Sequence, residues 1–428
     1  MSNITVDPRF ELISVLMRIS KAEEYIPDHY SLYDKEIDSY FSDFQNHPIV
    51  EQVNELRDNF EFGYDLPMAF ASCIIIQQDS ILVNEAAYKS LQLPIDNITL
   101  ERFLISLNDF YTSSNFSEFY NSHRDMYYKI CDTVSLYVND TDICWINSFT
   151  GYDIREFNII VSSINSKNNY AYMTSEEKGI VLGCQLAIDN NPIVSYLYKQ
   201  LIIHELLHLY LSPIVDIAWQ DISVVSHNLY SKCKSEFVSP KVMIEEWLVR
   251  LVTIYYFNAK PIPYISKESM IAYETENSVI WMSRSYDYFS HYLSNRKQYV
   301  TLYDFIPCIY NFLQFTYENW DNLYKEYLNR NPYISEIFYK DTSSGYTIEI
   351  VFSEPMLTEA YGIVAVNNHI IFPKLTNEAY WASDTRFVIP ISGENTPGEY
   401  GIRLLNNVFV SQRHYQMLED YSYTFNFE

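Results

Sequence analysis

The sequence predicts an α+β protein in which a mostly helical domain with a small β-sheet precedes an all-β sandwich. Apolar residues recur at helical spacing over most of residues 1–331. Short β-branched segments interrupt this pattern between residues 151 and 190. Residues 332–428 instead contain short stretches that alternate with a period near two, separated by turn signals. We therefore expect two domains, with the boundary between residues 331 and 332.

Residues 1 to about 150 are expected to be mostly helical. In Phe10–Met17 the apolar residues are spaced as on one helix face, and the following Tyr25-Ile26-Pro27 contains a helix-breaking proline. The same spacing recurs in four further segments: 34–44, 48–60, 100–111 and 116–137. These segments predict a helical N-terminal part.

Residues 151–212 are predicted to form a small sheet that leads into a long helix. Three short runs indicate strands: 156–162, 170–174 and 179–183. The first two flank the turn signal Asn168-Asn169 and would form a hairpin. Asn191-Pro192 is typical of a helix start, and we expect this helix to run through Leu211 and to end at Ser212-Pro213.

A second long helix is expected from Ser239-Pro240, because serine suits the N-cap and proline the first helical position. It would run through Tyr256, and residues 239–331 as a whole are predicted to be helical. Four strand-like runs follow in the C-terminal region: 346–352, 386–391, 400–405 and 421–427. About 95 residues of such strands predict a small β-sandwich.

The acidic composition excludes several classes of partner. The formal charge of -26 repels phosphate backbones and anionic membranes, so no nucleic-acid partner is expected. With only 9 glycines, and with neither GxGxxG nor GxxxxGK[ST] present, a nucleotide-binding loop is not expected either. The charge is interpreted as one that keeps the protein soluble.

No targeting or membrane segment is recognisable. We find no apolar stretch that approaches the roughly 18 residues needed to span a bilayer, and the N-terminus has no basic head before an apolar core. As given, the chain is expected in the cytoplasm, or outside it if a signal was removed. The 6 cysteines form no CxxC pair, which indicates buried free thiols rather than a disulfide framework.

The segment His204-Glu205-Leu206-Leu207-His208 places three ionisable groups in an otherwise apolar helix. Residues four apart lie on one helical face, so His204 and His208 can direct two imidazoles at a single metal ion. Glu205 lies beside that face and could accept a proton from a water held by the metal. A Zn²⁺ ion would therefore satisfy groups that would be costly to bury alone. The alternative is two histidines hydrogen-bonded within a core.

Catalytic zinc needs a third protein ligand and one open position. An extended HExxHxxGxxH motif is absent, because Leu211 and Ile214 occupy the last two required positions. The helix after Pro240 offers Glu245 and Glu246, and periodicity alone does not choose between them. Glu246 could instead form an ordinary pair with Arg250 one turn later. Weaker alternatives for site residues are Asp216, Asp221, His227 and His291.

With these residues in view, the chain resembles an uncharacterised bacterial family of predicted zinc metallopeptidases, known only as a domain of unknown function. The resemblance rests on His204–His208 followed by Glu246–Arg250, and on three further stretches: 6–14, 43–48 and 295–305. It spans residues 1 to about 330 and is similar to the gluzincin arrangement. It implies a zincin-like domain in which Glu246 is the third zinc ligand. Gluzincins of the thermolysin type carry an acid where this chain has Arg250.

The C-terminal region resembles bacterial immunoglobulin-like domains, on the residues of Ile348–Met356 and Pro397–Tyr400. Together the two resemblances imply a zinc metallopeptidase that acts on a peptide or protein substrate, with Glu205 as general base and an immunoglobulin-like sandwich appended. The strand at Gly179–Gly183 would border the cleft and pair with extended substrate as an edge strand does. The alternatives are a catalytically inert binding or structural protein on the same scaffold and, less favoured, a hydrolase of a non-peptide bond.

Overall fold

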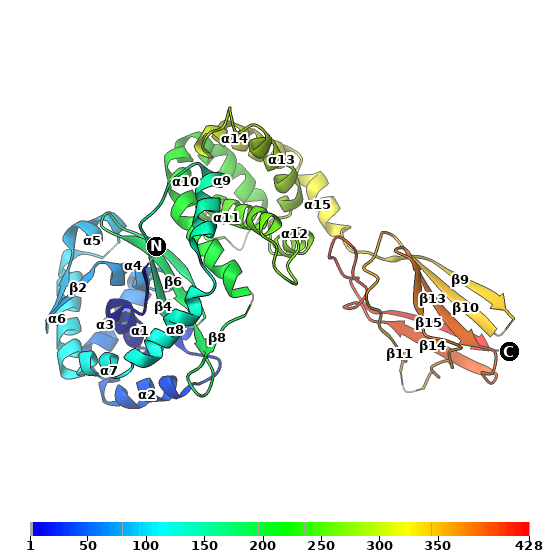
Figure 1. Cartoon of the computed structure of the whole chain (residues 1–428), viewed down its shortest axis with the longest axis horizontal. Helices are drawn as coiled ribbons and strands as arrows, with labels where there is room; N and C mark the ends of the chain where they lie inside the picture. Colours follow the sequence, from blue (N-terminus) through cyan, green and yellow to red (C-terminus); the bar gives the residue numbers. More distant parts are fainter. Residues whose placement is uncertain are drawn as a thin grey trace. The chain divides into compact units, whose positions relative to one another are not determined.

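Helices dominate the N-terminal part of the chain and β-sheets its C-terminal part, so the fold class is mixed α+β as predicted (Figure 1). The computed structural model describes residues 3–427 except 79, 94, 166, 196, 234–236, 344 and 368. The chain divides into two compact units. The first comprises Met1–Ser226, Phe237–Tyr256 and Ser290–Tyr310, and the second comprises His227–Glu236, Phe257–Phe289 and Asn311–Glu428. The domain boundary expected at residues 331 and 332 stays a prediction.

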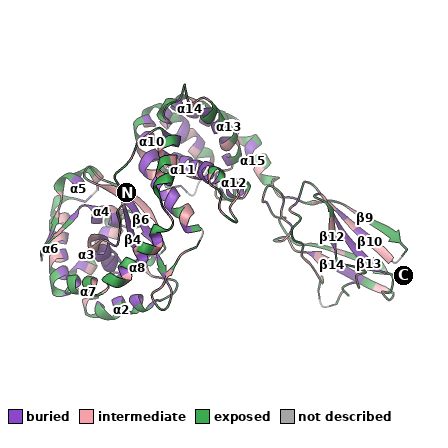
Figure 2. Cartoon of the chain, viewed as in Figure 1, coloured by how far each residue is buried: buried purple, intermediate pink, exposed green. Residues whose placement is uncertain are grey.

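The sheet of the first unit contains four strands: β1 (Asn3–Thr5), β4 (Asn158–Ser162), β5 (Tyr170–Met173) and β6 (Lys178–Gly183). Their order is β1-β4-β6-β5. β4 pairs in parallel with both β1 and β6, whereas β5 pairs antiparallel with β6. Nearly every residue of β4 and β6 is buried (Figure 2), as expected of central strands covered on both faces.

Two sequence-based predictions about this sheet are wrong. The run at 170–174 is not the hairpin partner of β4, because β5 pairs with β6 instead. The strand at Gly179–Gly183 is not an edge strand, because β6 has a partner on each side. Among the described residues β1 and β5 form the two edges of this sheet, and β5 pairs with β6 alone. Strand pairing is non-local, so turn signals near Asn168 did not reveal it.

Helix α1 (Pro8–Ile19) packs on this sheet and is almost wholly buried. Asp7 caps its first turn, accepting from Arg9 N at 2.9 Å, and Pro8 occupies the first helical position. The other described helices before β4 are η1 (Glu23–Tyr25), α2 (Leu32–Tyr40), η2 (Ser42–Phe44), α3 (Pro48–Phe60), α4 (Leu66–Ser72), α5 (Glu85–Leu91), α6 (Asn97–Ser113), α7 (Phe116–Ser122), α8 (Arg124–Ser135) and α9 (Asp140–Thr150). A hairpin of β2 (Ile74–Gln77) and β3 (Ser80–Val83) and the short pair β7 (Gln185–Leu186) and β8 (Pro192–Ile193) complete this part. The predicted helical character is confirmed.

The long helix α10 (Leu197–Cys233) differs from its prediction at both ends. Pro192 lies in β8 rather than at the helix start, and the helix continues through Pro213 for a further 20 residues. By length and composition α10 could cross a membrane: its most apolar 18-residue window has a mean hydropathy of 1.4, but 61% of that window is buried inside the protein. Core helices share this composition, so α10 is weak evidence for a membrane span.

The remaining helices are α11 (Pro240–Ala259), α12 (Lys267–Glu276), α13 (Met282–Ser294), η3 (Tyr303–Phe305), α14 (Ile306–Glu318) and α15 (Trp320–Leu328). The C-terminal strands are β9 (Ile334–Thr342), β10 (Gly345–Phe352), β11 (Ile363–Val364), β12 (Tyr380–Ser383), β13 (Arg386–Ser392), β14 (Gly398–Leu404) and β15 (Tyr421–Phe427). They form two sheets, ordered β12-β13-β10-β9 and β11-β14-β15. Ile350, Phe387 and Ile402, from both sheets, share one buried core.

Candidate metal centre

The first half of α10 presents two histidines from a buried helix. Ile203, Leu206 and Leu207 are fully buried and anchor the helix in the first unit. His204 and His208 lie one turn apart, with side chains 24% and 17% exposed, and their ring centroids are 5.1 Å apart. Both imidazoles are therefore held on one face of a rigid helix, as their spacing predicts.

Helix α11 supplies the facing carboxylate. It begins as the sequence predicts, with Ser239 Oγ accepting from Val242 N at 3.2 Å and Pro240 in the first turn. Trp247 and Leu248 on this helix are fully buried. Their burial holds the preceding residue, Glu246, against the histidine face of α10.

The three side chains converge on one point. Glu246 Oε1 lies 3.3 Å from His208 Nε2, and Glu246 Oε2 lies 3.7 Å from His204 Nε2. One ligand atom from each residue can be chosen such that all lie within 4.8 Å of one another. Ligand atoms about 2.0–2.1 Å from a tetrahedral zinc ion would be separated by about 3.3 Å. Two imidazoles and one carboxylate at these separations could hold a metal ion.

The electrostatics favour the metal-binding forms of Glu246 and His204 but the protonated form of His208, which would have to lose that proton to bind a metal ion. Burial would raise the pKa of Glu246, but the hydrogen bond to His208 and the charges of both histidines and Arg250 lower it to about 2. Burial lowers the pKa of His204 to about 4, so its imidazole is neutral. The pKa of His208 is raised, because its bond to Glu246 and the nearby acids outweigh the effect of burial.

Glu205 lies between the two histidines in sequence but outside the ligand group. Glu205 is buried, with only 8% of its surface exposed. Burial raises the pKa of its carboxyl group to about 7; the nearby charge of His208 opposes this rise, and that of Glu246 adds to it. A carboxyl group with a pKa near neutrality can both accept and return a proton. The arrangement suits a general base beside the metal ligands.

The alternative ligands lie elsewhere. Glu245 is 3.9 Å from Lys241 Nζ, which also pairs with Asp216, and burial raises the pKa of Glu245 to about 6. Asp221 and His227 are exposed on α10, and neither belongs to a ligand group among the described residues. The remaining candidate histidine contacts Asn295: His291 Nδ1 lies 3.2 Å from its Nδ2.

Two further residues lie near the site, of which the sequence identified Arg250 only as an ordinary partner of Glu246 and did not identify Tyr170. Arg250 Nε donates to Glu246 Oε2 at 3.2 Å, so the pair predicted between these two residues is present. Because Glu246 is a candidate metal ligand, this hydrogen bond also belongs to the candidate metal centre. Tyr170, on β5, lies within electrostatic range of Glu205. With 40 tyrosines in the chain, only the strand pairing distinguishes this one.

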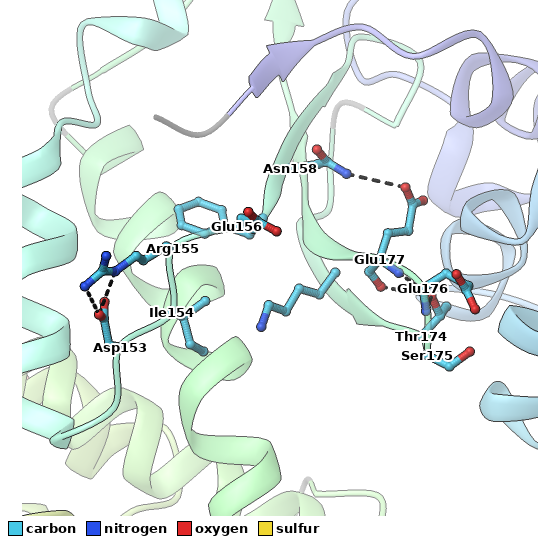
Figure 3. Close-up of a pocket in the computed structure, with 11 residues that line it drawn as sticks. Asp153, Ile154, Arg155, Glu156, Asn158, Thr174, Ser175, Glu176 and Glu177 are labelled. Atoms are coloured by element: carbon cyan, nitrogen blue, oxygen red, sulfur yellow. Dashed lines mark hydrogen bonds and ion pairs between the residues drawn. The ribbon is translucent and has the colours of Figure 1, made fainter.

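A separate polar hollow lies where β4 and β6 begin and β5 ends. It has a volume of about 630 Å³ and is lined by residues 153–158 and by 174–178, which include the β5–β6 turn (Figure 3). Arg155 pairs with Asp153 on one side, and Glu177 accepts from Asn158 Nδ2 at 3.4 Å on the other. None of the metal-centre residues lines this hollow.

Comparison with known proteins identifies one relationship. No curated protein and no solved structure matches the chain. A family model described as a domain of unknown function, DUF4932, matches residues 3–312, which is well over half of the chain and includes the whole candidate metal centre. The chain therefore belongs to the DUF4932 family.

Proposed function

We propose that the protein is a zinc-dependent metallopeptidase, with His204, His208 and Glu246 as zinc ligands and Glu205 as general base. The observation that carries the proposal is the convergence of two imidazoles and one carboxylate within 4.8 Å, with a buried acid beside them. Two histidines and a glutamate form a common ligand set of catalytic zinc. The proposal extends to a gluzincin-like scaffold and to an immunoglobulin-like identity for the C-terminal sandwich.

His204, His208 and Glu246 would hold the zinc ion, which would supply Lewis acidity toward a water molecule and a substrate carbonyl. Glu205 accepts the proton of the attacking water, because its pKa near 7 leaves it partly ionised at neutral pH. The protonated Glu205 then passes that proton to the leaving nitrogen of the peptide. The burial of Glu205 keeps bulk water from competing for this proton.

Strand β5 is the element best suited to bind an extended peptide. It pairs with β6 on one side only, so its other edge can add a substrate strand. Its residue Tyr170 lies within electrostatic range of Glu205, which links this edge to the proposed base. We therefore assign to β5 the role that the sequence suggested for Gly179–Gly183.

Bound zinc per chain tests the metal centre. Elemental analysis of the wild type is expected to give about one zinc, which Glu205→Gln retains because that residue is not a ligand. Glu246→Ala is expected to lose the metal, and Glu245→Ala, its matched neighbour, to keep it. A folded wild type that holds no zinc after metal is restored would overturn the proposal.

Hydrolysis tests the activity. Zinc-loaded wild type is expected to cleave an unfolded protein such as reduced casein, and Glu205→Gln is expected to be slower by at least about 10²-fold. Treatment with a chelator should abolish cleavage, and added zinc should restore it. A zinc-loaded chain that cleaves no peptide would favour the alternative, an inert binding protein.

A further inference from the structure

Strand β9 leaves a long backbone edge open on one side of the C-terminal sandwich. Among the described strands it pairs with β10 alone, so it is the outermost strand of its sheet (Figure 1). It is longer than the other described edge strands of the sandwich, β11, β12 and β15. All of its residues except Ile334 and Ile337 are exposed. In an antiparallel pair, alternate residues direct their backbone N–H and C=O groups away from the partner, so this edge can accept a further strand.

The side chains along β9 favour burial of this edge. Phe338 and Tyr339 are large aromatic residues, yet 39% and 42% of their surfaces are exposed. The ring of Tyr339 also lies 6.3 Å, between centroids, from that of Phe425 on β15, which is the outer strand of the second sheet. The two sheets thus end on the same side of the sandwich. A protein that pairs with β9 would cover part of β15 as well, which enlarges the contact.

The sequence of β9 is complementary to itself in one antiparallel register. When two copies pair with Phe338 opposite Phe338, Ile337 lies opposite Tyr339 and Glu336 lies opposite Lys340. Twofold symmetry repeats each of the last two pairs on the other side of Phe338. Aromatic, apolar and opposite-charge pairs directly across two strands are the pairs that stabilise a sheet. Every pair within residues 336–340 is therefore favourable.

The two charged residues of this register are available for pairing. Glu336 is exposed, and no ion pair ties it to another described residue. Lys340 Nζ donates to Glu349 Oε1 at 2.8 Å, but an ammonium group has three donors and can also bind Glu336 of a second copy. Only even shifts of the register keep the outward backbone groups opposed, and a shift of two residues in either direction places an uncharged residue opposite Glu336. The charges thus select the register that centres on Phe338.

We propose that the edge of β9 is a self-association surface, where two copies of this chain pair antiparallel about Phe338 and join their sandwiches into a symmetric dimer. The occupant is a second copy because the edge complements its own sequence in both polarity and charge. The contact is independent of the metal centre, since all its residues lie in the second unit. The formal charge of -26 on each chain opposes association at long range, and salt at about 0.15 M screens this repulsion beyond roughly 8 Å. The short-range pairs across β9 then decide the affinity.

Sedimentation equilibrium of the full chain at about 0.15 M salt tests the surface. Wild type is expected to pass from monomer to dimer at micromolar to submillimolar concentrations, since one pair of strands forms a small interface. Glu336→Lys and Lys340→Glu should each weaken dimerisation by about 10-fold or more, because like charges then face each other. The double variant Glu336→Lys/Lys340→Glu should recover the wild-type affinity. An equimolar mixture of the two single variants should form a heterodimer, because mixing brings opposite charges together again.

Glu359→Lys is the matched control. It changes the net charge as Glu336→Lys does, but it lies at an exposed position outside β9 and should leave dimerisation intact. Lys340→Glu also loses the bond to Glu349, so thermal unfolding of each variant is measured alongside. Glu336→Lys removes no ion pair that the described residues form, which keeps its effect on dimerisation separate from any effect on folding.

Three results would overturn the proposal: a wild type that stays monomeric throughout that concentration range, a dimer that neither charge reversal weakens, or a folded double variant that does not recover. Dimerisation that is weakened in both single variants, and regained in the double variant and in the mixture, would support the register about Phe338.

Discussion

Arg250 donates from its Nε to Glu246 Oε2 at 3.2 Å, while Glu246 Oε1 faces His208 at 3.3 Å. The two oxygens of one carboxylate are thus directed to different partners. The guanidinium group of Arg250 also lies over the ring of Phe237, 5.4 Å from its centroid. Packing and charge together hold Glu246 in the orientation required of a metal ligand.

Replacing Arg250 by glutamine is expected to weaken zinc binding by about 10- to 100-fold, because Glu246 loses the donor that orients it. Competition with a zinc-binding dye measures the affinity. Arg124→Gln, at an exposed position on α8, is the control and should not change it. Unaltered zinc affinity in Arg250→Gln would show that the contact does not position the carboxylate.

Lys199 connects α10 to α9 and α11, and its loss is expected to destabilise the first unit. Its Nζ donates to Asp142, whose other oxygen accepts from the Tyr256 hydroxyl at 2.6 Å. The Asp142 side chain is 2% exposed, so Lys199→Met is expected to cost about 3–5 kcal/mol. Lys89→Met, in a pair whose side chains are 74% and 82% exposed, should cost less than about 1 kcal/mol. Equal melting temperatures for the two variants would contradict this expectation.

Stability is expected to fall as the pH rises from about 4.5 to 7, because of Glu11. Burial raises the pKa of this residue from 4.5 to about 7, against the bonds from Tyr33 and Ser162 that lower it. Between these pH values the folded protein keeps a proton that the unfolded chain releases. The free energy of unfolding therefore falls by up to about 3 kcal/mol as the pH rises through this window. Urea unfolding at pH 5 and pH 8 should show a smaller pH dependence in Glu11→Gln. Identical pH dependences would refute the assignment.

Gly151 is expected to tolerate no side chain. It ends α9 at a φ of 79°, in the left-handed region, and an added Cβ would lie 2.5 Å from the carbonyl oxygen of Val300 and 2.7 Å from Thr301 Cα. Gly151→Ala should therefore lower the free energy of unfolding by more than about 1 kcal/mol, through backbone strain and the clash. Chemical denaturation of the full chain measures this, and an unchanged midpoint would count against the described turn.

Local patterns predicted the elements better than their arrangement. The start of α11 at Pro240 and the shared face of His204 and His208 follow from capping and helical periodicity, which depend only on nearby residues. Ser212-Pro213 predicts a helix end, but α10 passes through Pro213, since tertiary packing can outweigh the unfavourable propensity of proline.

The pairing of the strands in the sheet and the assembly of the candidate metal centre both depend on contacts between residues that are far apart in the sequence. Whether Gly179–Gly183 was an edge could not be known before its pairing with both β4 and β5. Glu245 and Glu246 were equivalent by periodicity; the family resemblance favoured Glu246, and in the structure Glu246 is the one that lies with His204 and His208. For the same reason no local signal distinguished Tyr170 from the other tyrosines.

The placement of the three proposed ligands on two helices would make a bound metal ion a reporter of how α10 and α11 assemble. Formation of α10 alone brings His204 and His208 together, and two imidazoles bind zinc only weakly. Glu246 joins them only when α11 packs against α10, so tight binding requires tertiary structure. Free zinc would stabilise the folded state by mass action, and the rate at which zinc is captured during refolding would measure how fast these two helices dock.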